Sequence, residues 1–223
     1  MTGQGDRCLY VDQPRTEVKP FIPADTVRVL DVGCWRGGFG ASLKADQPNR
    51  LVWGIEPDLE AAKVAAGRLD HVIVGSFPGD APQGQLFTTI TFIDVIEHFV
   101  DPWLALREAR RLLSADGVVV AAIPNIRHIE ALYPLVVHGR WDYRPAGLLD
   151  RTHLRFFTRA TAVELFEATG YEVVRVAPVN VACGGRNMRS IARLGRWCEE
   201  LVALHYVVVA RPLRGSSDGD PGA

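Results

Sequence analysis

The chain has 223 residues, of which 48% are hydrophobic and 23% are charged, and its net charge is −1. This length suits one α/β domain with a sizeable core, and the balanced charge gives no reason to expect a nucleic acid or an anionic membrane as a partner. We expect a cytoplasmic protein without a transmembrane segment or a structural zinc site, because the sequence shows no long apolar run, no charged-then-apolar leader and no C-x-x-C pair among its four cysteines.

Apolar runs typical of strands alternate with segments of helical periodicity along most of the chain. The predicted strands cover residues 27–31, 51–55, 72–74, 89–94, 117–123, 171–177 and 205–210, and the predicted helices cover residues 39–45, 58–69, 102–113 and 159–169. Strand–helix alternation at this spacing is typical of a parallel, doubly wound sheet. After Gly170 the pattern changes, and we expect the last two strands to form an antiparallel pair.

The domain organisation follows from shifts in composition. Residues 1–25 are polar and contain three prolines, so we predict a cap segment before one domain over residues 26–212. Residues 125–157 are too long for a simple connection and rich in aromatic side chains, which indicates an insertion on the substrate side. Residues 213–223 are mostly Gly, Ser, Asp and Pro and are predicted to be a disordered tail.

Sheets of this kind bind ligands at the carboxyl ends of their strands. The first predicted strand leads from Asp31 into a glycine-rich turn with Gly33 and Gly37, where a ligand can approach the backbone near a helix N-terminus. The glycine spacing differs from the G-x-G-x-x-G of dinucleotide binders, which argues against a nicotinamide-dependent oxidoreductase. The second strand ends at Glu56, whose carboxylate can accept hydrogen bonds from both hydroxyls of a ribose, or can instead cap the next helix.

The motifs at the strand ends resemble those of class I S-adenosylmethionine-dependent methyltransferases. They read D-V-G-C from Asp31, G-I-E-P-D around Glu56 and D-V-I-E-H-x-x-D-P from Asp94. A longer motif at residues 139–158, G-R-W-D-Y-x-x-x-G-L-L-D-R-T-H-L-R-F-F-T, is similar to a bacterial subgroup of that family, and the resemblance covers residues 10–176. It implies a Rossmann-like, seven-stranded α/β sheet, mostly parallel with an antiparallel C-terminal strand, and S-adenosyl-L-methionine as the cofactor.

The resemblance also implies which residues bind this cofactor. Asp31 would serve its methionine end, Glu56 its ribose, and Ser76 and Phe77, after the third strand, the edge of its adenine. Arg15 would fold over the cofactor and pair with its carboxylate, although a solvated arginine is the alternative.

Two positions depart from the family pattern. Relatives usually have glycine at the position of Trp35 and aspartate at that of Ser76. The indole would crowd the methionine portion, or point away if the turn keeps ordinary backbone angles, and serine is a weaker acceptor for the adenine amino group. These departures leave open a non-catalytic S-adenosylmethionine-binding protein of the same fold.

Methyl transfer needs alignment of acceptor, methyl group and sulfur, and a destination for the proton of the acceptor. Asp94 and His98, after the fourth strand, would face the transfer pocket. His153 and His98 are the candidate bases, since an unperturbed imidazole has a pKa of about 6.5. Asp150 is predicted to orient His153, with a purely structural Asp150–His153 pair as the alternative. His128 has no motif support and is expected at the surface, and no metal site is predicted.

The leading prediction for the reaction is O-methylation of a small molecule, such as a sugar or a natural-product intermediate. The preference for oxygen rests on analogy with the subgroup, so N-methylation stays open. Four arginines at positions 186, 189, 193 and 196 follow helical spacing. They favour a solvated helix face, with an anionic substrate or an anionic membrane surface as the alternative. The oligomeric state is left open.

Overall fold

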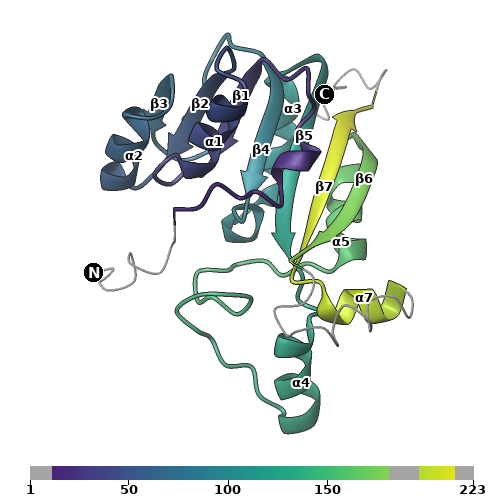
Figure 1. The fold of residues 1–223 in the computed structure, drawn as a ribbon. Helices are drawn as coiled ribbons and strands as arrows, with labels where there is room; N and C mark the ends of the chain where they lie inside the picture. The colour runs from purple at the N-terminus through teal and green to yellow at the C-terminus, as the bar shows by residue number, and fades with distance from the viewer. Residues whose placement is uncertain (1–11, 181–195, 214–223) are drawn as a thin grey trace, which may run out of the picture.

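A seven-stranded sheet with the order β3-β2-β1-β4-β5-β7-β6 forms the centre of the computed structural model, which describes residues 12–180 and 196–213 (Figure 1). The strands are β1 (Arg28–Val32), β2 (Leu51–Glu56), β3 (His71–Val74), β4 (Phe87–Ile93), β5 (Leu113–Pro124), β6 (Tyr171–Val179) and β7 (His205–Pro212). The first five strands are parallel, and β7 runs antiparallel between β5 and β6. The predicted fold class is thus confirmed.

The helices connect the strands and cover the sheet. They are α1 (Gly38–Asp46), α2 (Leu59–Ala66), α3 (Pro102–Arg111), α4 (Ile129–His138), α5 (Arg159–Glu167) and α7 (Arg196–Val202), with short 3-10 helices η2 (Lys19–Phe21) and η3 (Ile96–His98). All four predicted helices are present, with ends that differ by a few residues. The fifth strand begins earlier than expected, because α3 ends at Arg111 and the chain pairs with β4 from Leu113 onward.

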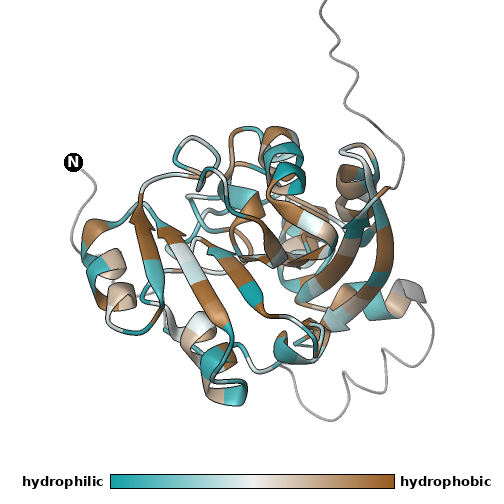
Figure 2. Cartoon of the chain, turned by 90° about the horizontal axis from the view of Figure 1, so that it is seen from above, coloured by the Kyte–Doolittle hydropathy of each residue, from teal (hydrophilic) through white to brown (hydrophobic). Residues whose placement is uncertain are grey.

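The sheet is buried on both faces, which explains why its strands could be predicted from apolar runs in the sequence. Neighbouring residues of β1 point in opposite directions: Val29 belongs to the apolar cluster that includes α1, and Leu30 to the cluster that includes α3 and α5. Seen from above, most of the central strands carry hydrophobic colours (Figure 2). Burial of both faces fixes the register of the strands, and with it the positions of their carboxyl ends.

The insertion contains a helix that the sequence did not predict. α4 and the loop that follows it lie beyond the carboxyl end of β5 (Figure 1). Pro134 lies inside α4 and interrupts the helical pattern of the sequence. Several apolar side chains of this helix face outward, and Val136 is 77% exposed. The expectation of a surface position for His128 is wrong, because its buried ring accepts a hydrogen bond from the Glu130 backbone and caps α4.

Part of the predicted organisation lies outside the described residues. This applies to Arg186, Arg189 and Arg193 of the predicted arginine face and to residues 214–223 of the predicted tail. Arg196 is the first residue of α7. Over the part of the chain that the structure describes, no helix is both long and apolar enough to cross a membrane.

Candidate active site

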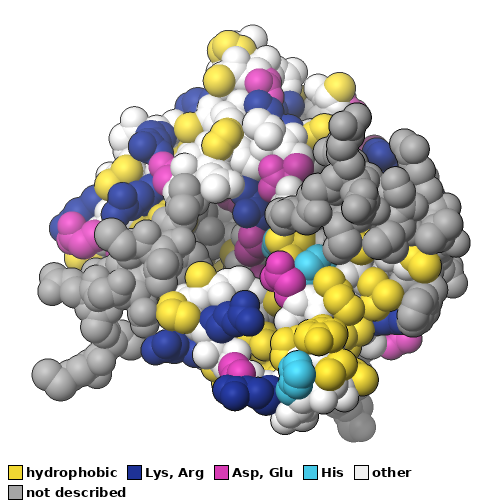
Figure 3. All heavy atoms as spheres, turned by 60° about the horizontal axis from the view of Figure 1, so that its bottom comes forward, with side chains coloured by type: hydrophobic (Ala, Val, Ile, Leu, Met, Phe, Trp, Pro, Cys, Tyr) yellow, Lys and Arg dark blue, Asp and Glu magenta, His cyan; other side chains and the backbone are white. Residues whose placement is uncertain are grey.

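A cavity of about 1070 Å³ lies at the carboxyl ends of the parallel strands. Figure 3 views the molecule from this end, where acidic side chains and a histidine gather around the middle of the face. The predicted site residues in the cavity lining are Arg15, Asp31, Gly33, Trp35, Glu56, Ser76, Phe77, Asp94, His98, Asp150 and His153. Ligand pockets typically measure about 300–1000 Å³, so this cavity has room for a nucleotide-sized cofactor together with a small acceptor.

The two predicted glycines of the first turn have different surroundings. Gly33 lines the cavity with φ of 68°, and a Cβ at this position would lie 2.5 Å from a methyl group of Val95. Gly37, with φ of 78°, is not among the lining residues, and a Cβ there would meet the backbone of Ala65 at 3.2 Å. The structure therefore gives Gly37 a role in packing α1 against α2, and of these two glycines Gly33 is the one that lines the cavity.

Trp35 adopts a backbone conformation that normally belongs to glycine. Its φ is 49°, in the left-handed region. The turn therefore does not keep the ordinary backbone angles that were the condition for an indole pointing away from the cofactor. The side chain is half-buried and lines the cavity, with the Arg36 guanidinium 5.6 Å from the ring centroid. The turn thus has a backbone conformation that favours glycine, and Trp35 adds an aromatic side chain to the cavity wall there.

Asp31 is a buried carboxyl group at the end of β1. It is 3% exposed, and its Oδ1 accepts a hydrogen bond of 2.7 Å from Oγ1 of Thr91, its register partner on β4. Burial raises the pKa of Asp31 to about 7, although the Thr91 hydrogen bond opposes the shift. A cationic ligand in the cavity would favour the ionised form.

Glu56 is held by the backbone on both sides. One carboxylate oxygen accepts from the Trp35 N–H and the other from the Asp58 N–H, each at 2.9 Å, and burial raises the pKa of this side chain. The helix cap is Asp58, whose side chain accepts from the backbone of Glu60 and Ala61. The alternative role of Glu56 as a cap is therefore not what the structure shows, and its fixed carboxylate faces the cavity.

Ser76 and Phe77 follow β3 as predicted. The Ser76 N–H donates to the carboxylate of Asp80 at 2.9 Å, and the serine side chain is exposed. Phe77 is buried, with its ring 5.7 Å from that of Phe92 and 6.5 Å from that of Phe99. This aromatic group makes an apolar wall at the β3 end of the cavity.

Arg15 forms ion pairs with protein carboxylates. Its Nη2 contacts the Asp94 carboxylate, and its Nε lies 3.2 Å from Glu17, so it is not the solvated arginine considered above. The other Asp94 oxygen lies 3.4 Å from Nε2 of His205, and burial lowers the pKa of this histidine. Sequence reasoning missed His205 as a site residue, although its place inside an apolar run was a signal.

His153 has a main-chain partner that was not predicted, in addition to the charge of Asp150, which acts to raise the pKa of the ring. Its Nδ1 lies 3.1 Å from the carbonyl oxygen of Leu148, whereas the Asp150 carboxylate accepts from the N–H and hydroxyl of Thr152. A short turn inside the insertion therefore fixes the imidazole through the main chain. Burial, and then the nearby His98, lower the pKa of His153, which keeps the ring neutral near pH 7.

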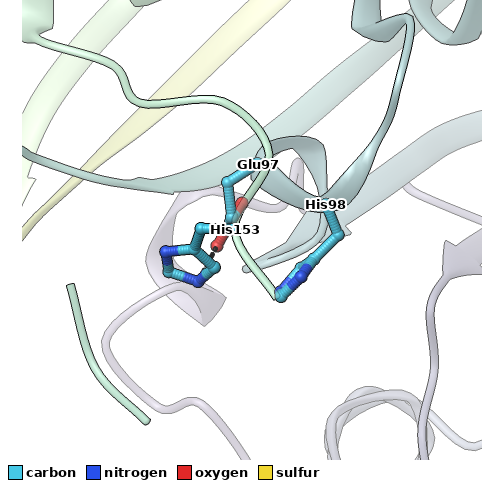
Figure 4. Close-up of side chains that lie close together, drawn as sticks. All are labelled: Glu97, His98 and His153. Atoms are coloured by element: carbon cyan, nitrogen blue, oxygen red, sulfur yellow. Dashed lines mark ion pairs between the residues drawn. The ribbon is translucent and has the colours of Figure 1, made fainter. Parts of the chain in front are cut away.

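Glu97, His98 and His153 form a compact group, here called the Glu97–His98–His153 cluster (Figure 4). Nε2 of His153 lies 3.8 Å from a Glu97 carboxylate oxygen, and the two imidazole rings meet edge to face with centroids 4.8 Å apart. Glu97 is 1% exposed, and burial together with the Asp94 carboxylate raises its pKa well above the ordinary value. Glu97 stood in a recognised motif, but no role was predicted for it.

The cluster joins two distant parts of the chain. Glu97 and His98 belong to η3 after β4, and His153 belongs to the insertion. The main-chain oxygen of Glu97 accepts hydrogen bonds from the N–H groups of Leu154 and Arg155, at 2.8 and 3.0 Å. These two bonds hold His153 against η3.

Comparison with known proteins assigns the sequence to a methyltransferase family. Residues 10–176 match the family described as the methyltransferase domain. A ubiquinone biosynthesis O-methyltransferase from Azorhizobium caulinodans is 26% identical over 171 residues, which cover 72% of this chain and 65% of that relative. A ubiquinone biosynthesis O-methyltransferase from Paracidovorax citrulli is 28% identical over 167 residues, which cover 67% of this chain and 68% of the relative.

Solved structures show the same fold. A SAM-dependent methyltransferase from Thermotoga maritima, described as a possible histamine N-methyltransferase, has a TM-score of 0.61 at 19% identity, with 87% of this chain and 84% of that chain covered. The plantazolicin methyltransferase in complex with S-adenosylhomocysteine also has a TM-score of 0.61, at 15% identity, with 85% and 77% covered. At these sequence identities the similarity shows a shared fold and nothing beyond it.

The burial of Asp31 predicts a pH-dependent loss of stability in the ligand-free protein. The pKa of Asp31 is about 7 in the folded state, against an ordinary value of 3.8, so the folded state holds an extra proton between these pH values. The resulting contribution to stability falls as the pH rises. Asp31→Asn removes the effect, so the variant should gain roughly 2–3 kcal/mol relative to the wild type between about pH 5 and pH 8. Urea unfolding at both pH values measures the difference. Asp25→Asn, which changes an exposed aspartate, is the control, and a gain no larger than the control's would refute the assignment.

Proposed function

The chain belongs to the methyltransferase domain family, and from that premise we propose that it moves a methyl group from S-adenosyl-L-methionine to an oxygen atom of a small molecule. The observation that carries the proposal is the cavity, which brings the buried carboxyl groups of Asp31 and Glu56 together with the imidazoles of His98 and His153. The two curated relatives act in ubiquinone biosynthesis as O-methyltransferases, which supports oxygen as the acceptor atom. A sugar or a natural-product intermediate with a free hydroxyl group is the proposed class of acceptor.

The residues at the ends of β1, β2 and β3 fit the cofactor. Glu56 has both oxygens fixed by backbone donors and keeps further lone pairs for the two ribose hydroxyls. Asp31 is a buried carboxyl group that a bound ammonium group would ionise, which suits the amino group of the methionine end. Phe77 offers an apolar surface to the adenine. The ion pairs of Arg15 with Asp94 and Glu17 support a role in shaping the pocket in place of the predicted pair with the cofactor carboxylate.

Bound S-adenosylmethionine supplies a methyl group on a positively charged sulfur. The task of the chain is then to align the acceptor with it and to remove the proton of the acceptor. We assign proton removal to His98 and His153, whose rings line the cavity and whose Nδ1 atoms each lie within hydrogen-bond distance of a carbonyl oxygen. A donating Nδ1 leaves Nε2 as the basic nitrogen of each neutral ring.

The remaining assignments rest on the sequence. The motif at residues 139–158 supports membership of the bacterial subgroup, in which the insertion covers the sulfonium end of the cofactor. The absence of C-x-x-C pairs supports a cytoplasmic location, where thiols stay reduced. Incubation with deuterium-labelled S-adenosylmethionine and a panel of hydroxylated and aminated compounds, read by mass spectrometry, tests the reaction. A labelled methyl ether is the expected product. A labelled amine would instead show that the acceptor atom is nitrogen.

Replacement of Glu56 should weaken the cofactor product. Glu56→Ala removes a charged acceptor from the ribose site, and we expect S-adenosylhomocysteine affinity to fall by about 1.5–3 kcal/mol. Isothermal titration calorimetry measures the change. Glu60→Ala is the matched control, since this glutamate lies on the exposed face of α2 and pairs with Lys63. Equal affinity in wild type and a folded Glu56→Ala variant would show that the ribose binds elsewhere.

Replacement of Trp35 should separate fold stability from binding. Trp35→Gly relieves a left-handed backbone that an L side chain adopts at a cost of about 1–2 kcal/mol, so unfolding should be nearly unchanged despite the lost apolar area. The loss of an aromatic contact should weaken S-adenosylhomocysteine by about 3- to 10-fold. Trp35→Phe keeps an aromatic ring in the same turn and should bind like the wild type. Tighter binding by Trp35→Gly would mean that the indole obstructs the site.

Replacement of His153 should affect turnover and spare the cofactor. His153→Ala is expected to lower turnover by about 10²–10⁴-fold, with S-adenosylhomocysteine affinity unchanged. His138→Ala, on an exposed residue of α4, controls for the loss of an imidazole. His153→Gln keeps a donor for the Leu148 carbonyl but has no basic nitrogen, so it should be as slow as His153→Ala. Full activity of the glutamine variant would make His153 a purely structural residue.

A further inference from the structure

Three side chains with metal-ligand chemistry meet at the histidine end of the cavity. Glu97, His98 and His153 each offer one ligand atom, and these atoms all lie within 4.8 Å of one another. We propose that the Glu97–His98–His153 cluster binds one divalent transition-metal ion, which coordinates the acceptor oxygen. The catalytic use of the ion rests on the proposed methyl transfer, whereas its binding does not.

The donor set indicates the class of metal. Two imidazole nitrogens and one carboxylate oxygen are typical ligands of Zn²⁺, Fe²⁺, Co²⁺ and Mn²⁺, whereas Mg²⁺ and Ca²⁺ prefer sites made of oxygen alone. Three protein ligands leave at least one coordination position open. All three side chains line the cavity, so a hydroxyl group of a bound acceptor could occupy that position.

Glu97 carries the argument, because its buried carboxyl group lacks hydrogen bonds among the described residues. It is 1% exposed, and among the described residues neither of its carboxylate oxygens has a hydrogen-bond partner. Buried carboxyl groups are normally paired or hydrogen-bonded, since desolvation otherwise destabilises the fold. Arg15 forms its ion pairs with Asp94 and Glu17. A carboxylate beside an imidazole can stabilise its protonated form, but Glu97 lies 3.8 Å from His153 without a hydrogen bond, whereas a bound cation would bring both side chains within ligand distance.

The two histidines have the supporting contacts that metal ligands usually have. Nδ1 of His153 lies 3.1 Å from the carbonyl oxygen of Leu148, and Nδ1 of His98 lies 3.2 Å from that of Thr152. Metal-binding imidazoles commonly donate one ring N–H to a backbone carbonyl, which fixes the tautomer and leaves the other nitrogen for the ion. Both carbonyls belong to the insertion, so the same segment supplies one ligand and orients both rings.

The geometry requires a small contraction. Ligand atoms about 2.0–2.2 Å from one zinc ion lie about 3.4 Å apart in a tetrahedral site. Nε2 of His153 and the Glu97 carboxylate are already 3.8 Å apart, and the widest separation within the cluster is below 4.8 Å. Metal binding would therefore require the partly exposed His98 side chain to move toward the other two ligands. Figure 4 shows the three side chains converging from η3 and from the insertion.

The cation would change how the acceptor loses its proton. Coordination to a divalent ion lowers the pKa of a hydroxyl group, so the proton can pass to solvent. As the bond from oxygen to the methyl carbon forms, the bond from carbon to sulfur breaks, and its electron pair stays on sulfur in the neutral thioether product. In this mechanism the ion takes over the proton removal assigned above to His98 and His153, and the two imidazoles act as its ligands.

Cobalt titration tests the site without any methyl acceptor. The full chain, stripped with EDTA and dialysed, is titrated with Co²⁺ while its visible absorption is recorded, and Zn²⁺ is added in competition. We expect one equivalent of Co²⁺ to bind, and Zn²⁺ to displace it. Glu97→Gln and His153→Ala should each weaken binding by at least about 100-fold, more than the typical loss of an outer-shell partner. His138→Ala should bind like the wild type.

The outcomes separate this inference from the proposed function. Absence of stoichiometric Co²⁺ or Zn²⁺ binding, or binding that both folded cluster variants retain, overturns the metal site. Circular dichroism shows whether Glu97→Gln folds, and His153→Ala tests the site if it does not. Calorimetry with S-adenosylhomocysteine on the same samples tests the cofactor site on its own. Metal binding that persists in Glu56→Ala, while S-adenosylhomocysteine binding is weakened, is the expected sign that the two sites are distinct.

Discussion

Parallel strands that end at one edge bring the carboxyl groups of Asp31 and Glu56 into the same cavity as Glu97, and each of the three is at most 5% exposed. Burial of carboxyl groups opposes folding unless other interactions compensate for the lost hydration. Asp31 is compensated by the Thr91 hydroxyl and Glu56 by two backbone N–H groups. The apolar clusters on both faces of the sheet stabilise the strands that hold these groups in place.

A second constraint assembles the histidine end of the cavity. The backbone of Leu154 and Arg155 binds the main-chain oxygen of Glu97, so the insertion is tied to η3 at the residue that also enters the cluster. The contacts of His153 and His98 with the Leu148 and Thr152 carbonyls depend on that tie. The position of the imidazoles is therefore set by main-chain hydrogen bonds, which tolerate side-chain changes elsewhere in the insertion.

Much of the fold could be predicted because both faces of the sheet are buried, so each strand reads as an apolar run between turn signals. α4 could not, because Pro134 and outward-facing apolar residues give no amphipathic pattern. The residues at the strand ends could be predicted from their position in the sheet, but the partners of their side chains could not. Local spacing favoured Asp150 as the partner of His153, but it did not predict the contact of the ring with the Leu148 carbonyl. The ion pair between Arg15 and Asp94 joins residues 79 positions apart, which periodicity does not reveal.

The central claim is that one cavity holds the cofactor at the ends of β1 and β2 and the acceptor at the Glu97–His98–His153 cluster. A crystal structure of the complex with S-adenosylhomocysteine tests it most directly. The account predicts the ribose hydroxyls against Glu56, the adenine beside Phe77 and the sulfur on the side of the cavity that His98 and His153 line. A complex with the adenine at the histidines, or with the ribose away from Glu56, would contradict it.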